Sequence, residues 1–309
     1  MSYRLTDHEP VPDNLKRIIV EQIDMALAHL ASTSGNQDDV LHDARVCLKK
    51  IRAVLRLVQA DIPGDIFHQE YVCYRDAGRR LSALRDAAAM VETIDKLTDR
   101  FADQLATDAF TELRQPLRRS STARRLEKQK ARFEVAKTSR VARARVAHWP
   151  LHHNGFSAVH QGLKRVYKQG RRSFATACDH PSVENFHEWR KHVKCLWYHI
   201  RLLKPIWAPM MDRFADELKT LGEYLSDDHD LALLRQRVLE QTGKANGRMD
   251  LEALVALIEQ RRGELQVEAR RLGARVYVEQ PRAFTARLKV YWQAWRAERH
   301  VDPIAVSGR

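Results

Sequence analysis

The chain contains the same helical motif twice, at a constant separation. HDARVCLKKIRAVLR begins at His42 and HEWRKHVKCLWYHIR begins at His187, which is 145 residues later (187 − 42). The same separation relates further pairs of basic residues: Arg45 and Arg190, Lys49 and Lys194, and Arg56 and Arg201. A general tendency to form helices does not place matching charges at one offset, so the pattern indicates a duplicated helical unit.

Long helices are expected over most of the chain. Its 309 residues include only 12 Gly and 10 Pro, and 44% are hydrophobic, which favours long helices around a substantial core. Apolar residues recur every three or four positions in the segments 12–32, 38–60, 63 to beyond 79, 83–97, 114–145, 156–177, 181–203, 208–225, 228–241, 250–278 and 281–300. WPLHHNG, residues 149–155, is interpreted as the linker between the two halves.

One face of the first repeated helix carries a line of basic residues, which we call the first stripe. It consists of His42, Arg45, Lys49, Arg52 and Arg56. At about 100° per residue these side chains fall within roughly 80° of the helix circumference, and their line is about 21 Å long. Apolar residues flank the stripe on both sides, and the stripe contains no acid.

A solvated helix face normally mixes charges of both signs and is polar across its whole width. The first stripe differs on both counts, so we expect it to face a cleft or pore. Like charges held this close repel unless an anion compensates them. The expected occupant is therefore anionic and extended.

The second stripe consists of His187, Arg190, Lys194 and Arg201, with Trp197 in the place of a fourth cation. This replacement predicts weaker anion binding by the second half. His42 and His187 are interpreted as groups that become charged when bound phosphates favour the imidazolium form. No HxxxH or HExxH accompanies them, so a metal is not expected.

Other basic residues are candidates for further contacts with the anion. The complete candidate set is His42, Arg45, Lys49, Lys50, Arg52, Arg56, Arg75, Arg79, Arg80, Arg85, Lys164, Arg165, Lys168, Arg171, Arg172, His187, Arg190, Lys191, Lys194, Arg201, Lys219 and His229. For the group at 164–172, a solvated surface is an equally good interpretation. The basic segment 114–145 is expected to supply general electrostatic attraction.

The acidic cluster SDDHD at 226–230 has two interpretations. It could hold a metal, but acids also suit a helix N-terminus, where they accept hydrogen bonds from free main-chain amides. We favour a helix that begins here. Asp230 also corresponds to Asp86 in the first half, at a separation of 144 residues (230 − 86).

The net charge of +13 predicts attraction to polyanions, namely nucleic acid, an anionic membrane surface or a phosphate polymer. The first residues do not resemble a signal peptide, and no apolar run is long enough to span a membrane. Four cysteines without a CxxC pair fit a reducing cytoplasm.

The chain lacks GxxxxGK[ST], GxGxxG and GxSxG, and the stripes offer no acidic metal ligands, so neither catalytic residues nor a cofactor are expected.

The two motifs, each followed by a leucine-rich helix and then LSALRD or LSDDHD, resemble those of the CHAD family, the conserved histidine α-helical domain. The resemblance extends over about 12–300. It implies an all-α fold in which two pseudo-symmetric four-helix bundles surround a central basic pore, here with additional long C-terminal helices. The first bundle and its basic arm would occupy 1–148 and the second bundle and the C-terminal helices 149–309, together forming one domain.

The same resemblance implies non-enzymatic binding of inorganic polyphosphate and association with cytoplasmic polyphosphate granules and the proteins found there. The ExExK signature of the triphosphatase domains joined to many relatives is absent here. A helical protein that binds nucleic acid non-specifically is the alternative, although no recognition motif supports it. A metal-dependent phosphohydrolase is a third, weaker alternative.

Overall fold

The computed structural model describes residues 3–33, 36–82, 86–103, 110–111, 114–115, 117–119, 125–242 and 248–298. These residues are predominantly helical and include no strand, which confirms the all-α prediction. The helices are α1 (Val11–Ala31), α2 (Gln37–Val58), α3 (Gly64–Ser82), α4 (Asp86–Arg100), α6 (Arg125–Val146), α7 (Ser157–Asp179), α8 (Val183–Leu202), the 3₁₀ helix η1 (Lys204–Ile206), α9 (Ala208–Thr242), α10 (Arg248–Val276) and α11 (Pro281–Ala297).

Side-chain caps begin the two helices that carry the stripes. At the start of α2 the Asn36 side chain accepts a 3.1 Å hydrogen bond from the main-chain N–H of Asp38. At the start of α8 the Ser182 hydroxyl accepts one of 3.1 Å from the N–H of Asn185. Each cap satisfies an amide that has no partner within its helix, which fixes where the helix begins.

One predicted boundary is wrong. The segments expected as separate helices at 208–225 and 228–241 form the single helix α9, so the acidic cluster lies inside a helix and not at its N-terminus. No Gly or Pro interrupts 226–230, and the Ser226 hydroxyl donates to the Gly222 carbonyl within the helix. The acids instead pair with neighbouring helices: Lys96 of α4 contacts Asp227, and Arg262 of α10 contacts Asp228, both at 3.0 Å.

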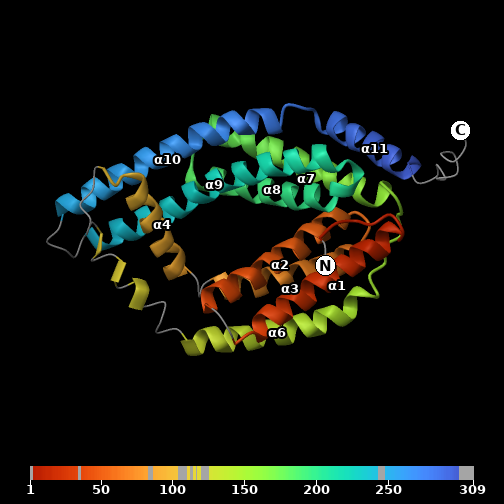
Figure 1. Cartoon of the computed structure of the whole chain (residues 1–309), viewed down its shortest axis with the longest axis horizontal. Helices are drawn as coiled ribbons and strands as arrows, with labels where there is room; N and C mark the ends of the chain where they lie inside the picture. Colours follow the sequence, from red (N-terminus) through yellow and green to blue (C-terminus); the bar gives the residue numbers. More distant parts are fainter. Residues whose placement is uncertain are drawn as a thin grey trace, which may run out of the picture.

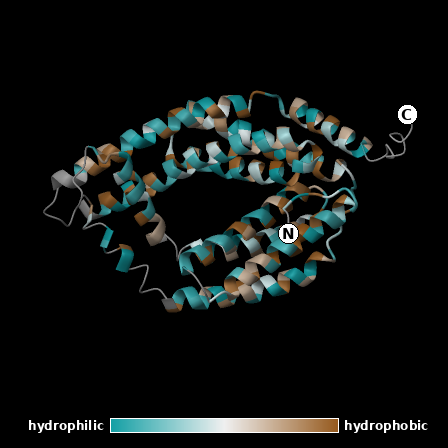
Figure 2. Ribbon diagram, in the orientation of Figure 1, coloured by the Kyte–Doolittle hydropathy of each residue, from teal (hydrophilic) through white to brown (hydrophobic). Residues whose placement is uncertain are grey.

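The helices pack in two groups (Figure 1). In the first, α1 and α3 each contact both α2 and α6. In the second, α7 and α9 each contact both α8 and α10, while α11 packs on α7 and α4 packs on α9. Helix α2 also contacts α7 and α8 and thereby joins the groups. Hydrophilic and hydrophobic residues alternate along the helices, as expected for amphipathic helices that pack through one face (Figure 2).

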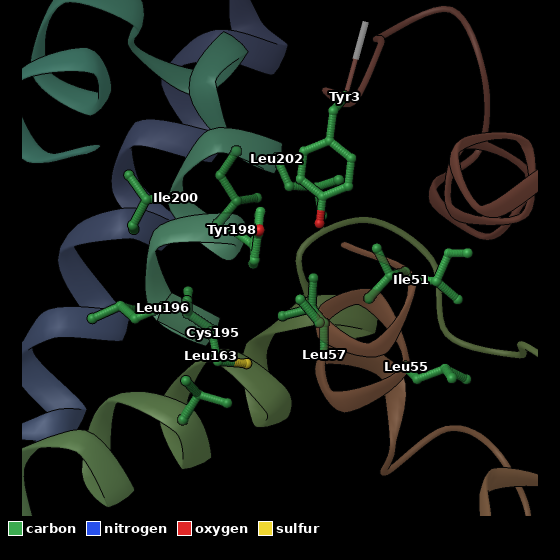
Figure 3. Packing of buried hydrophobic residues seen from close by; sticks show 14 of the residues in the cluster. Tyr3, Ile51, Leu55, Leu57, Leu163, Cys195, Leu196, Tyr198, Ile200 and Leu202 are labelled. Carbon is green, nitrogen blue, oxygen red and sulfur yellow. The ribbon is translucent and has the colours of Figure 1, made fainter. Parts of the chain in front are cut away.

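A single hydrophobic core extends through both groups. At the junction it contains Leu55 and Leu57 of α2, Leu163 of α7 and Leu196 of α8 (Figure 3). Helix α7 crosses the end of α2 at very short range, because a Cβ placed on Gly162 would lie 1.8 Å from the carbonyl oxygen of Leu57. Only glycine permits this approach of one helix to the backbone of the other. A second core lies between α4, α9 and α10.

Candidate anion-binding cavity

A cavity of about 310 Å³ lies between α2, α3 and α8. It is lined by Arg45, Leu48, Lys49, Arg52 and Arg56 of α2, by Tyr71, Arg75, Gly78, Arg79 and Ser82 of α3, and by His187 and Lys191 of α8. None of these lining residues carries a carboxylate. The cavity therefore presents several positive charges to its contents, as a site for a multiply charged anion would.

The two stripes meet at Lys49. Its side chain is exposed to solvent at the cavity, and protein atoms are nevertheless densely packed around it. The pKa of Lys49 is lowered to about 7, first by burial and then by neighbouring cations. Those cations are Arg45 and Arg52 of α2 and Arg190 and Lys194 of α8. Charges from both repeats thus act on one amine.

Two further interactions act between α2 and α8. Burial raises the pKa of the Cys195 thiol, but His199 and then the Arg56 guanidinium beside it lower that pKa to about 7. Burial lowers the pKa of the Lys50 amine, and the positive charge of Arg201 lowers it further. A shift of 145 residues converts Arg56 into Arg201 and Lys50 into Cys195, so the two residue pairs correspond, the first as a favourable contact and the second as a repulsion between cations.

Tyr71 of α3 holds the last two cations of the first stripe. Its hydroxyl oxygen accepts hydrogen bonds from Arg56 at 2.6 Å and from Arg52 at 3.2 Å. Both guanidinium carbons lie 5.2 Å from the centre of the Tyr71 ring. Burial raises the pKa of Tyr71, but these two arginines outweigh burial and lower it. The aromatic ring and its hydroxyl together fix both guanidinium groups at the cavity.

Trp197 contacts two cations of the second stripe, as Tyr71 does in the first. Nζ of Lys194 lies 5.6 Å, and the guanidinium carbon of Arg201 lies 4.8 Å, from the centre of a Trp197 ring. The indole therefore attracts both cations and offsets part of the repulsion between them. Like the second-stripe cations Arg190, Lys194 and Arg201, it is not among the residues that line the cavity.

His187 and His229 form a pair of rings whose centres are 4.2 Å apart. Burial and the nearby charges of Arg190 and Lys191 lower the pKa of His187. Burial, His187 and Arg190 lower the pKa of His229 to about 4. Both Nδ1 atoms are buried and make no hydrogen bond within the described residues. The pair is accordingly neutral at pH 7 and borders the cavity through His187.

Other candidate residues around α8 and α9 have local partners. Arg190 donates a 2.9 Å hydrogen bond to the Ser226 hydroxyl, and burial lowers its pKa. Lys191 pairs with Glu188 on the same helix, although it also lines the cavity. Lys219 is exposed and lies 3.8 Å from Glu223. His42 is partly buried near the start of α2 and is not a lining residue.

The candidates of α7 lie apart from the cavity, because no α7 residue lines it. Arg165 donates to the main-chain carbonyl of Arg56, and Arg171 donates to that of Tyr277 at 3.3 Å. Lys164 approaches His160, whose pKa is lowered by burial and then by Lys164 and Lys289 of α11. Lys168 and Arg172 are exposed. Arg165 thus faces α2, whereas Arg171 faces the end of α10, and Lys168 and Arg172 face the solvent.

Of the remaining candidates on α3 and α2, some line the cavity and others do not. Arg79 lines the cavity, whereas Arg80 is exposed and not a lining residue. Lys50 points toward the N-terminal segment, where its Nζ lies 5.3 Å from the centre of the Tyr3 ring. Arg85 lies outside the described residues.

Two polar lining residues were absent from the candidate set: Tyr71 and Ser82 of α3. Ser82 follows the candidate Arg75 by seven residues, a spacing that places both on the same face of α3. Nothing in the local pattern links Tyr71 to arginines of another helix. Only the packing of α3 on α2 brings them together.

A family model described as the CHAD domain matches residues 17–239. The chain belongs to the CHAD domain family. The match begins within α1 and ends within α9, so the cavity of this CHAD domain lies inside the matched span while α10 and α11 follow it. No curated protein matches the chain.

Within the described ranges, no group of three or more His, Cys, Asp or Glu side chains is arranged to hold a metal ion. The described helices include none with an apolar stretch sufficient to cross a bilayer. A second cavity of about 430 Å³ between α4, α9 and α10 mixes both charge signs, with Lys96, Arg100 and Arg261 beside Asp99, Asp227 and Asp230. In the first cavity, by contrast, all the charged lining residues are basic.

Proposed function

We propose that this CHAD domain binds inorganic polyphosphate in the cavity between α2, α3 and α8, without catalysing a reaction. The observation that carries the proposal is Lys49, whose pKa is lowered by burial and then by cations from both repeats. Such a concentration of positive charge is unfavourable on its own and becomes favourable when an anion occupies the site. Arg45 and Arg56 are 11 residues apart on α2, about 16 Å, which favours an extended anion over a single phosphate.

The proposal extends to the arrangement around the site. We take the α1, α2, α3, α6 group and the α7, α8, α9, α10 group as two bundles related by a pseudo-twofold axis, with a basic pore between them. The correspondence of the pairs Arg56–Cys195 and Lys50–Arg201 under the 145-residue shift supports this relation. Polymer lying along the axis would meet the first stripe directly and the second more weakly, because Trp197 occupies one cation position.

The test is a calorimetric titration with long-chain polyphosphate. We expect the Arg45→Glu/Lys49→Glu variant to bind at least about tenfold more weakly than the wild type, because it reverses two charges inside the cavity. The matched control is Lys130→Glu/Lys137→Glu, which reverses two charges on the exposed face of α6. Equal losses in the two variants would overturn the proposal, because they would show attraction by net charge alone.

Nucleic acid is the second candidate, favoured by the net charge of +13 and by the exposed cations of α6. Duplex DNA at equal phosphate concentration should displace polyphosphate poorly if the polymer binds inside the cavity. Salt dependence does not discriminate, because both polymers release counterions. Phosphate release in the presence of a divalent metal would instead indicate a hydrolase. The proposal also places the protein at cytoplasmic polyphosphate granules, which fluorescence co-localisation would test.

A further inference from the structure

We propose that Lys49 is a site of covalent acylation by acyl phosphates, small metabolites that carry a reactive acyl group on a phosphate. The cavity supplies both elements that such a reaction needs. One is a set of cations that can hold the phosphate end of the reagent. The other is an amine within the same cavity. The inference requires phosphate recognition by the cavity but does not depend on binding of the polymer.

The cations around Lys49 come from every helix that borders the cavity. Helix α2 contributes Arg45 and Arg52, and α8 contributes Arg190 and Lys194, which act on the amine directly. The α3 residues that line the same space are Tyr71, Arg75 and Arg79. A volume of about 310 Å³ accommodates a small acyl phosphate, and guanidinium groups bind phosphate oxygens through paired hydrogen bonds.

The reaction transfers the acyl group from the phosphate to the Lys49 amine. Nζ of uncharged Lys49 attacks the carbonyl carbon of the acyl phosphate, and a C–N bond forms as the C–O bond to the phosphate breaks. Inorganic phosphate leaves with the bonding electrons and takes up the proton lost by the amine. Surrounding cations stabilise the departing phosphate, as they stabilise negative charge that develops in acyl transfer generally.

The protonation of Lys49 favours this reaction. Only the uncharged amine is nucleophilic, and the pKa of Lys49 is about 7. In the ligand-free cavity, a larger fraction of Lys49 than of an ordinary lysine, whose pKa is about 10.4, is therefore uncharged at pH 7. The product amide is permanently neutral, so acylation removes the cation at which the stripes meet. If the proposed function holds, acylation would lower affinity for the polymer.

The experiment compares two reagents on the wild-type protein at pH 7. Acetyl phosphate carries the anionic group that the cavity should recognise, and acetic anhydride delivers the same acetyl group without it. Peptide mass spectrometry gives the acetylation rate at Lys49 and at Lys130, an exposed lysine on α6. With acetyl phosphate we expect Lys49 to react at least about tenfold faster than Lys130, since its uncharged fraction is so much larger.

The rate at Lys49 relative to Lys130 should be greater with acetyl phosphate than with acetic anhydride. Pyrophosphate, which competes for the cavity, should reduce the selectivity with acetyl phosphate to the value found with acetic anhydride. Equal rates at the two lysines with acetyl phosphate would overturn the inference. So would a selectivity that is the same for both reagents, because it would show reactivity without phosphate recognition. Lys49 acetylation in a protein that fails to bind polyphosphate would sink the proposed function alone. Polymer binding without selective acetylation would sink this inference alone.

Discussion

The hydroxyl oxygen of Tyr71 accepts a 2.6 Å hydrogen bond from the guanidinium of Arg56. It accepts a second, of 3.2 Å, from Arg52. A phenol oxygen has two lone pairs and one proton, so the two arginines use its accepting capacity and the proton must be donated elsewhere. Because Tyr71 lines the cavity, that proton is available to an anion bound there.

Replacing Tyr71 with Phe should weaken polyphosphate binding about threefold to tenfold, by removing one donor and the acceptor that orients two arginines. The slope of affinity against salt concentration should not change, because no cation is lost. Calorimetry at several salt concentrations measures both quantities. Tyr291→Phe is the control, since Tyr291 also contacts an arginine, Arg287, but on α11 outside the cavity. A normal affinity for Tyr71→Phe would contradict this role.

Lys49→Gln should stabilise the ligand-free protein and weaken binding of the anion. The pKa of Lys49 is about 7 in the fold and about 10.4 in an unfolded chain. The unfolded state therefore binds more protons between these values, so stability rises with pH across that window. We expect the gain in unfolding temperature from Lys49→Gln to be largest at pH 6 and to vanish near pH 10. A gain that does not depend on pH, or one shared by Lys130→Gln, would count against this account.

The His187–His229 pair should make the protein sensitive to acid. The pKa of His229 is about 4 in the fold, below the usual value of about 6.5, so the unfolded state takes up its proton first as the pH falls. Stability should consequently decrease from pH 6.5 towards pH 4, by up to about 3 kcal/mol from this residue. Denaturant melts should show a smaller decrease for His229→Phe. The exposed His148 provides the control, and His148→Phe should retain the full decrease.

Trp197→Ala should lower the free energy of unfolding by about 1–3 kcal/mol, because it removes aromatic contacts to Lys194 and Arg201 that offset part of the repulsion between them. Trp197→Phe should recover part of this loss, since it keeps an aromatic face beside the two cations. Urea melts of the three proteins measure the difference. Equal stability of the Ala variant and the wild type would show that the indole does not compensate these charges.

Asp228→Ala should be among the most destabilising substitutions in α9. The carboxylate is buried, and one of its oxygens accepts hydrogen bonds from Arg262 at 3.0 Å and from Gln266 at 2.9 Å. Its removal leaves the buried Arg262 guanidinium without this partner, at a loss of about 3–5 kcal/mol. Asp227→Ala is the control, because Lys96, its partner, is largely exposed. Urea melts should show a loss below about 1 kcal/mol for that variant.

Periodicity in the sequence predicted most of the helices and the face of α2 that borders the cavity. Arg45, Lys49, Arg52 and Arg56 line it together, as one helical stripe should. The acidic residues at 226–230 were misleading, because they suit a helix N-terminus but instead pair with Lys96 and Arg262 of other helices.

The contribution of Tyr71 could not be predicted, because it depends on how α3 packs against α2. The same limit applies to the separation of Lys168 and Arg172 from the cavity, which follows from the direction in which α7 crosses α2. A pattern along one helix specifies which residues share a face. It does not specify which other helix that face will meet.

The close crossing at Gly162 has a consequence for the free energy of binding. Helix α7 rests against the Leu57 carbonyl, and Arg165 donates to the neighbouring carbonyl of Arg56, so the end of α2 is fixed relative to the second group of helices. The crossing therefore opposes a separation of the two cationic helices that would relieve their repulsion. On the proposed function, an incoming chain of phosphates would find the charges already spaced, and little of its affinity would be lost to rearranging the fold.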